Sequence, residues 1–84
     1  MPRVTLYTTQ TCPYCIRARR LLERKGVVYE EIDINDDPAQ RAVMIERSGR
    51  HTVPQIFIGE RHIGGYDDMA ELDVCGDLDP LLAA

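Results

Sequence analysis

The segment Thr11–Cys15 reads TCPYC, and it holds two of the chain's three cysteines, separated by two residues. Cysteines at this spacing occur as half of a zinc site, as a structural disulfide or as a redox-active dithiol. A redox-active dithiol exchanges electrons with other disulfides through a mixed-disulfide intermediate. The rest of the sequence has to decide between these three kinds of site.

A zinc site needs more ligands than this pair provides. Only Cys75, His51 and His62 remain as cysteine or histidine, and their spacing matches no common zinc pattern, so we expect no metal. Three cysteines are too few, and odd in number, for a secreted disulfide framework. In a reducing cytoplasm a CxxC pair is more often catalytic or metal-binding than structural. A redox dithiol of Cys12 and Cys15 is therefore the favoured interpretation.

The composition is that of one small domain spanning residues 1–84, with 44% hydrophobic residues and a net charge of −4. This charge gives no general attraction to nucleic acid or to an anionic membrane, and we expect neither as a partner. The N-terminal residues MPRVTLYTT contain no long apolar run, so we expect no signal peptide or membrane anchor there. We expect a cytoplasmic protein.

The elements that must position the cysteines follow one another in a clear order. Patterning predicts a strand over 4–8, a helix from the cysteine pair to Gly26, a strand over 27–34, a helix over 37–49, a hairpin of 55–58 and 61–64, a helix over 66–76, and a turn followed by an apolar contact in the tail, 77–84. Strand, helix and strand within some thirty residues form a βαβ unit, whose strands are parallel. The predicted fold class is α/β, a four-stranded mixed sheet flanked by three helices, and a CxxC beside a βαβ unit indicates a thioredoxin-like redox site.

Cys12 falls where the first strand ends and the first helix begins. Pro13 suits the first helical turn, because its missing N–H would be unpaired there. Free N–H groups and the helix dipole then favour the thiolate of Cys12, which is the attacking species. Cys15 lies one turn further along the helix, within reach of a mixed disulfide on Cys12. We therefore expect Cys12 to attack and Cys15 to resolve.

Three motifs in this order, CPYC at 12–15, TVP at 52–54 and GGYDD at 64–68, resemble the dithiol glutaredoxins, most closely the small bacterial ones of the glutaredoxin 3 kind. The resemblance runs essentially from end to end. It implies an enzyme with a thioredoxin-like fold that reduces protein disulfides and glutathionylated mixed disulfides. Glutathione would be the reductant and co-substrate, itself restored by glutathione reductase and NADPH. The resemblance also implies a monomer.

The resemblance implies that the TVP segment binds the cysteinyl part of glutathione. A cis bond before Pro54 would turn the backbone of Val53 outward beside Cys12, where its N–H and C=O groups would pair with the ligand like an added strand. Thr52 completes this segment. From the residues alone, the alternative is that Pro54 simply opens the next strand, because few X–Pro bonds in folded proteins are cis.

The GGYDD segment would bind the γ-glutamyl end of glutathione. Gly65 lets the backbone come close, and the helix N-terminus at Tyr66 offers N–H groups to a carboxylate. Asp67 or Asp68 would accept from the ligand ammonium, although Asp67 could also be an N-cap and Asp68 a partner of the helix dipole. The ring of Tyr14 would contact the peptide, or else only pack.

The glycine carboxylate of glutathione needs a cation, and here the chain departs from the family. The family usually has a lysine three residues before the first cysteine, where this chain has Thr9. Arg41 takes the family's second polar position for this carboxylate, on the second helix. Our hypothesis is that Arg41 makes this contact, the alternative being an ordinary solvated helix residue.

Two other functions fit part of the sequence. A small redoxin reduced by thioredoxin reductase shares the fold and the CxxC, but such proteins typically lack the aspartate pair after the glycines; Thr9 weakly favours this alternative. An iron–sulfur cluster carrier would use the first cysteine and bound glutathione. Carriers of that kind usually lack proline after the first cysteine, so Pro13 disfavours the function.

Two features lie outside the motifs. The first helix carries a run of positive charge, Arg17, Arg19, Arg20 and Arg24. Such a run is usually a solvated face, although at low salt it would also raise the local concentration of anionic glutathione. Cys75 is expected to be a passive thiol, the alternative being regulatory glutathionylation or a disulfide-linked dimer.

Overall fold

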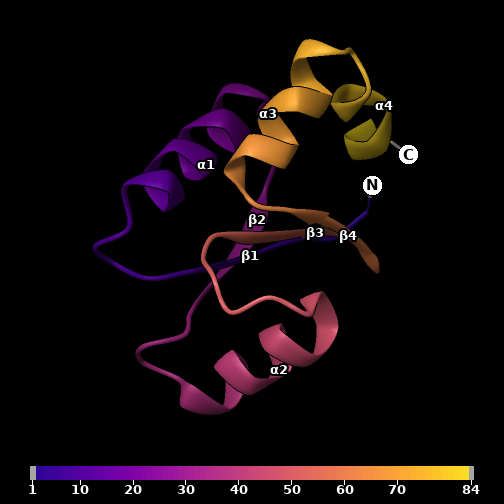
Figure 1. Ribbon diagram of the computed structural model, residues 1–84. Helices are drawn as coiled ribbons and strands as arrows, with labels where there is room; N and C mark the ends of the chain where they lie inside the picture. The colour runs from indigo at the N-terminus through magenta and orange to yellow at the C-terminus, as the bar shows by residue number, and fades with distance from the viewer. Residues whose placement is uncertain (1, 84) are drawn as a thin grey trace.

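The computed structural model describes residues 2–83 of the chain. Figure 1 shows a central sheet with helices on both of its faces. The strands are β1 (Val4–Thr8), β2 (Tyr29–Asp33), β3 (Gln55–Ile58) and β4 (Arg61–Gly64), and the helices are α1 (Pro13–Arg24), α2 (Pro38–Ser48), α3 (Tyr66–Val74) and α4 (Leu78–Ala83).

The four strands lie in the order β2-β1-β3-β4. β1 and β2 are parallel, because α1 carries the chain back along the sheet between them, whereas β3 is antiparallel to both β1 and β4. The β3–β4 hairpin turns at Gly59, which has a φ of +61° that favours glycine. This arrangement confirms the predicted mixed sheet, its βαβ unit and its hairpin.

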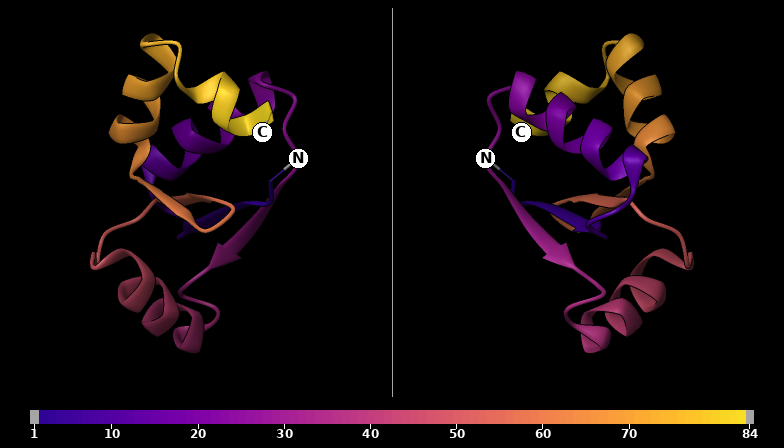
Figure 2. Two further views of the ribbon diagram at one scale, coloured as in Figure 1. Left: turned by 90° about the vertical axis from the view of Figure 1, so that its right-hand side faces the viewer. Right: turned by 90° about the vertical axis from the view of Figure 1, so that its left-hand side faces the viewer.

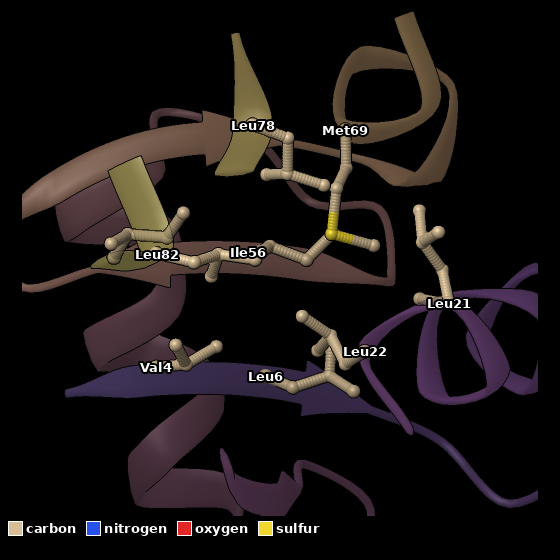
Figure 3. Close-up of a cluster of buried hydrophobic side chains, with 10 residues drawn as sticks. Val4, Leu6, Leu21, Leu22, Ile56, Met69, Leu78 and Leu82 are labelled. Carbon is tan, nitrogen blue, oxygen red and sulfur yellow. The ribbon is translucent and has the colours of Figure 1, made fainter. Parts of the chain in front are cut away.

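The larger hydrophobic core lies between the sheet and the helices α1, α3 and α4 (Figure 3). Its buried members are Val4, Leu6, Ala18, Leu21, Leu22, Ile56, Ile58, Met69, Leu78 and Leu82. Three of them, Ala18, Leu21 and Leu22, recur at helical spacing on α1. The helix that begins at the cysteine pair is thereby anchored to the sheet.

A smaller core fills the space between the opposite face of the sheet and α2, the helix that lies alone on that side in both views of Figure 2. Tyr7 and Phe57 from the sheet meet there edge to face, with ring centroids 5.8 Å apart, and pack with Ile34 and Met44. The Arg47 guanidinium lies 4.0 Å from the Phe57 ring centroid and donates to the Tyr7 hydroxyl at 3.0 Å. These contacts hold α2 against the sheet.

The second strand is shorter than predicted. The expected span was 27–34, but β2 covers only Tyr29–Asp33. The amide of Val27 donates to the Leu22 carbonyl at 3.2 Å and so completes the end of α1, and Val28 is 92% exposed. The apolar pattern over these residues therefore predicted a strand where the chain is still closing a helix.

The tail is a fourth helix rather than the predicted turn, so residues 2–83 contain four helices instead of three. Leu78 and Leu82 stand one helical turn apart and are both buried in the larger core. The predicted tail extended to Ala84, which lies outside the described residues. Among residues 2–83, every helix is too short or too polar to span a lipid bilayer.

Candidate active site

Cys12 is the N-cap of α1, with Pro13 as the first helical residue. The Cys15 amide donates to the Cys12 sulfur at 3.4 Å, and the Cys12 thiol donates to the Val53 carbonyl at 3.6 Å. The sulfur therefore sits between the positive end of a helix and the TVP segment. In the thiolate form the amide still donates to it, whereas the Val53 carbonyl loses its donor and becomes available to another.

Cys15 has the opposite environment. Its side chain is fully buried, whereas Cys12 is partly exposed. Burial raises the pKa of Cys15 to about 12, and the hydrogen bond and charge of Cys12 add to the increase. Cys15 is therefore a neutral thiol at physiological pH while Cys12 is the accessible sulfur, which assigns the two cysteines different chemistry.

This difference predicts selective alkylation. Because burial raises the pKa of Cys15 to about 12, this thiol stays protonated at pH 8. In a Cys75→Ser background, which removes the exposed third thiol, iodoacetamide should modify only Cys12 of the reduced folded protein, as read by intact mass and peptide mapping. The same protein in urea should take up two groups. Comparable alkylation rates at both cysteines in the folded protein would contradict the burial argument.

A groove of about 220 Å³ adjoins the Cys12 sulfur at Val53. It is lined by Tyr14, Arg50, Thr52, Val53, Pro54, Gly65, Tyr66, Asp67 and Asp68. The structure thus brings together every glutathione-contact residue named from the sequence except Arg41. The Val53–Pro54 peptide bond is cis, as expected from the resemblance. The groove has a backbone edge at one end and a helix N-terminus at the other.

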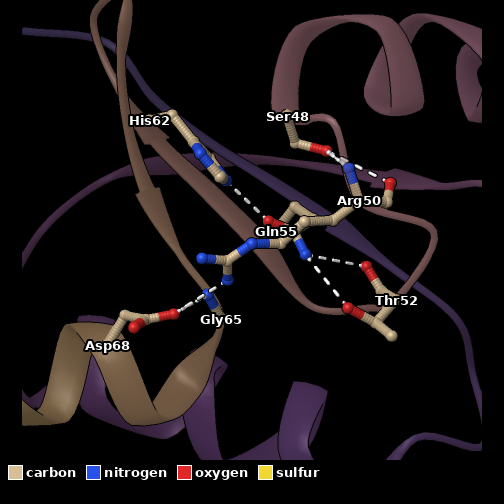
Figure 4. Close-up of polar contacts among 7 residues, drawn as sticks. All are labelled: Ser48, Arg50, Thr52, Gln55, His62, Gly65 and Asp68. Carbon is tan, nitrogen blue, oxygen red and sulfur yellow. Dashed lines mark hydrogen bonds and ion pairs between the residues drawn. The ribbon is translucent and has the colours of Figure 1, made fainter.

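The GGYDD end of the groove is organised by an ion pair that the sequence did not indicate (Figure 4). Asp68 accepts from the Gly65 amide at 2.9 Å and from Arg50 at 3.0 Å through the same oxygen, Oδ2. The pKa of Asp68 is lowered first by the Gly65 amide and then by Arg50. The helix is therefore capped by Asp68 rather than by Asp67, and Arg50 adds a cation to the groove wall.

Comparison with known proteins adds to this geometry. The glutaredoxin family model matches residues 4–63. This chain belongs to the glutaredoxin family. Glutaredoxin 3 of Escherichia coli K12 is 57% identical to it over 82 residues, covering 98% of this chain and 99% of that protein. A glutaredoxin of Pseudomonas aeruginosa is 54% identical over 84 residues, covering 100% of both chains.

Solved structures of other glutaredoxins share the fold of this chain. A crystal structure of a buckwheat glutaredoxin–glutathione complex matches with a TM-score of 0.90 at 32% identity, covering 98% of this chain and 77% of that one. The solution structure of glutaredoxin from Brucella melitensis matches with a TM-score of 0.85 at 55% identity, covering 98% and 89% of the two chains. The protein has the thioredoxin-like glutaredoxin fold, and it is a thiol–disulfide oxidoreductase with a dithiol active site.

A polar network supports the TVP segment of this glutaredoxin from behind. The Gln55 side chain is fully buried and donates to the backbone oxygen of Thr52 at 3.0 Å and to its hydroxyl at 3.3 Å (Figure 4). The Gln55 amide oxygen therefore faces His62, whose Nε2 lies 2.7 Å away and carries the proton in this arrangement. Burial lowers the pKa of His62, with a further contribution from Arg50. His62 is a support of the segment rather than part of the groove wall.

Three other residues singled out from the sequence lie away from the groove. Arg41 is exposed on α2, Thr9 is half-buried before the cysteine pair, and neither lines the groove. Cys75 is exposed at the end of α3, beside a separate cavity. Within residues 2–83, no three histidine, cysteine or acidic side chains are grouped so as to hold a metal ion.

Proposed function

We propose that glutathione supplies the electrons for this glutaredoxin, and that its substrates are protein disulfides and glutathionylated proteins. The supporting observation is the groove beside Cys12, which joins the backbone edge at Val53 to the helix N-terminus at Tyr66. A tripeptide with an anionic end needs both features, the first for main-chain pairing and the second for its carboxylate. The buckwheat relative was crystallised as a glutathione complex.

For a glutathionylated protein, the Cys12 thiolate attacks the glutathione sulfur of the mixed disulfide. The bond to the protein cysteine breaks, and that cysteine leaves as a thiolate and takes a proton from solvent. Cys12 now carries glutathione, whose cysteinyl backbone pairs with Val53. The thiolate of a second glutathione attacks the bound glutathione sulfur, so glutathione disulfide leaves and the Cys12 thiolate is restored.

For a protein disulfide, Cys12 attacks one sulfur and the other leaves as a thiolate. This step removes the charge of Cys12, which is one cause of the high pKa of Cys15. Cys15 can then lose its proton more easily, and its sulfur attacks that of Cys12 to form the intramolecular disulfide and release the reduced protein. Two glutathione molecules reduce this disulfide and leave as glutathione disulfide. The reaction belongs in a reducing compartment such as the cytoplasm.

The ion pair between Arg50 and Asp68 gives Asp67 and Asp68 different roles in the groove. Asp68 is already engaged by the Gly65 amide and by Arg50. Asp67 is exposed and takes part in none of the ion pairs within residues 2–83. We therefore assign the γ-glutamyl ammonium to Asp67, with Asp68 holding the end of the helix in place.

The cation for the glycine carboxylate is a separate question, because Arg41 and Arg50 lie in different places. If Arg41 carries the contact, Arg41→Ala should raise the KM for glutathione about fivefold, the size expected of a charged hydrogen bond at the surface. It should also abolish the preference for glutathione over its glycyl ethyl ester. Arg50→Ala should keep that preference, because Arg50 lies at the γ-glutamyl end, and Arg61→Ala serves as the control. An unchanged KM and an unchanged ester preference in Arg41→Ala would show that Arg41 is an ordinary solvated residue with no contact to glutathione.

The reductant itself is tested by oxidising the protein to the Cys12–Cys15 disulfide. Glutathione with glutathione reductase and NADPH should reduce it quickly, whereas thioredoxin reductase with NADPH should not. The reverse result would favour the redoxin that Thr9 weakly suggested. A Cys15→Ala trap would then identify the protein partners by mass spectrometry, because mixed disulfides on Cys12 could no longer be resolved. Alanine is preferred to serine because Cys15 is fully buried.

A further inference from the structure

A second, larger groove continues from the proposed glutathione groove. It has a volume of about 540 Å³ and is lined by Arg17, Arg20, Glu23 and Arg24 of α1 and by Tyr66 of α3. Tyr66 lines both grooves, so the two share a wall. The larger groove therefore leads away from the reacting sulfur along the outer face of α1.

The three arginines of this groove outnumber its single acidic side chain, Glu23. Arg17, Arg20 and Arg24 are spaced three and four apart, which places them on one face of α1, and all three are exposed. None takes part in the ion pairs within residues 2–83. The single acid of the groove, Glu23, accepts from a tyrosine hydroxyl at 3.3 Å. By contrast, Arg19 on another side of the helix is paired with a glutamate of β2.

The positive face of α1 contrasts in sign with the whole chain, whose net charge is −4. Like charges three and four residues apart repel and weaken the helix that carries them. An anionic occupant would relieve this repulsion. The groove thus has the charge, the volume and the position to receive an anionic group beside the active site.

The groove also has a definite length and starting point. The Arg17 guanidinium lies 5.2 Å from the centroid of the Tyr14 ring, so the positive face starts at the CPYC segment. From there to Arg24 the helix rises by roughly 10 Å, which is the span of about three residues of extended peptide. Glutathione in the other groove would leave this space empty.

We propose that this groove docks an acidic segment of a protein substrate, adjacent to the cysteine whose disulfide is reduced. The proposal rests on the proposed function, since it concerns the substrates of the same site. Substrates with two or three aspartates or glutamates near the target cysteine would be bound in preference to neutral ones. The preference is electrostatic, so it weakens as salt increases.

The test uses two synthetic peptides with one glutathionylated cysteine and with either glutamate or glutamine at three flanking positions. We expect kcat/KM with glutathione at low salt to be about tenfold higher for the acidic peptide. In Arg20→Gln/Arg24→Gln the preference should fall to about twofold or less. In Arg3→Gln/Arg61→Gln, which removes the same charge from exposed positions outside both grooves, it should persist.

Several results would overturn the proposal: no preference in the natural protein, an equal preference in Arg20→Gln/Arg24→Gln, or an equal loss for both peptides in that variant through a raised KM for glutathione. If glutathione turned over neither peptide, the proposed function would fail instead. Fluorescence anisotropy with labelled serine versions of the two peptides would still decide the docking question. Tighter binding of the acidic version, lost only in Arg20→Gln/Arg24→Gln, is the expected result.

Discussion

Cys12→Ser is expected to lower the rate of deglutathionylation by at least about a thousandfold, because a serine hydroxyl is not ionised at neutral pH and cannot form the mixed disulfide. Cys12 is the partly exposed sulfur at the helix N-terminus, and Cys15 is buried and neutral. No other sulfur is available at that position. The measurement is kcat/KM for a glutathionylated peptide, coupled to glutathione reductase and NADPH.

Cys15→Ala should behave differently, because it removes only the resolving sulfur. Its rate with a glutathionylated peptide should stay within about threefold of the natural protein, while its turnover of a protein disulfide should be largely lost. Cys75→Ser should leave both rates unchanged, since Cys75 lies beside a separate cavity. Deglutathionylation by Cys12→Ser, or its loss in Cys15→Ala, would show that the roles of the two cysteines have been assigned wrongly.

Gly64→Ala is expected to cost about 2–4 kcal/mol of stability, from an unfavourable backbone conformation together with the loss of a helix cap. Gly64 has a φ of +119°. A methyl group there would lie 2.8 Å from the carboxyl carbon of Asp68 and 3.0 Å from its Cβ, so the whole side chain would have to move. In a domain of this size the melting temperature should fall by about 10–20 °C. The KM for glutathione should rise as well, because Asp68 holds the Gly65 end of the groove.

Gly76→Ala is the matched control for this substitution. Gly76 also has a positive φ, of +80°, but nothing lies within 4 Å of an added methyl group. It should lose only about 1–2 kcal/mol, with an unchanged KM for glutathione. Equal melting temperatures and equal KM values for the two alanine variants would show that the contact with Asp68 has no consequence.

The sequence alone predicted the parts of this glutaredoxin that depend on near neighbours. Capping and turn residues act within a few positions, so Pro13, Asp37 and Gly49 were enough to predict where helices begin and end. Strand, helix and strand in close succession implied the parallel pair, because a short chain has few ways to connect them. The resemblance then indicated the residues of the glutathione groove, all of which line it apart from Arg41.

Local sequence patterns gave wrong predictions for two segments whose structure is set by contacts with other parts of the fold. Val27 and Val28 have the β-branched pattern of a strand, but the Val27 amide is used by the end of α1. The sequence predicted only a final apolar contact for the tail that contains Leu78 and Leu82. These residues instead form a helix, because a helix lets both side chains pack into the larger core. In each case the packing partner decides the structure, and it lies outside the window in which a pattern is recognised.

Residue types and their spacing were enough to identify the reacting pair and the order of the elements that carry it. The contacts between residues far apart in the sequence became visible in the folded protein. Arg50 meets Asp68 across 18 residues, Gln55 connects Thr52 with His62, and the arginines of α1 share a groove with Tyr66. The physical reason is that charge and hydrogen bonding act over a few ångströms in space, whereas sequence patterns report only contacts that are also close along the chain.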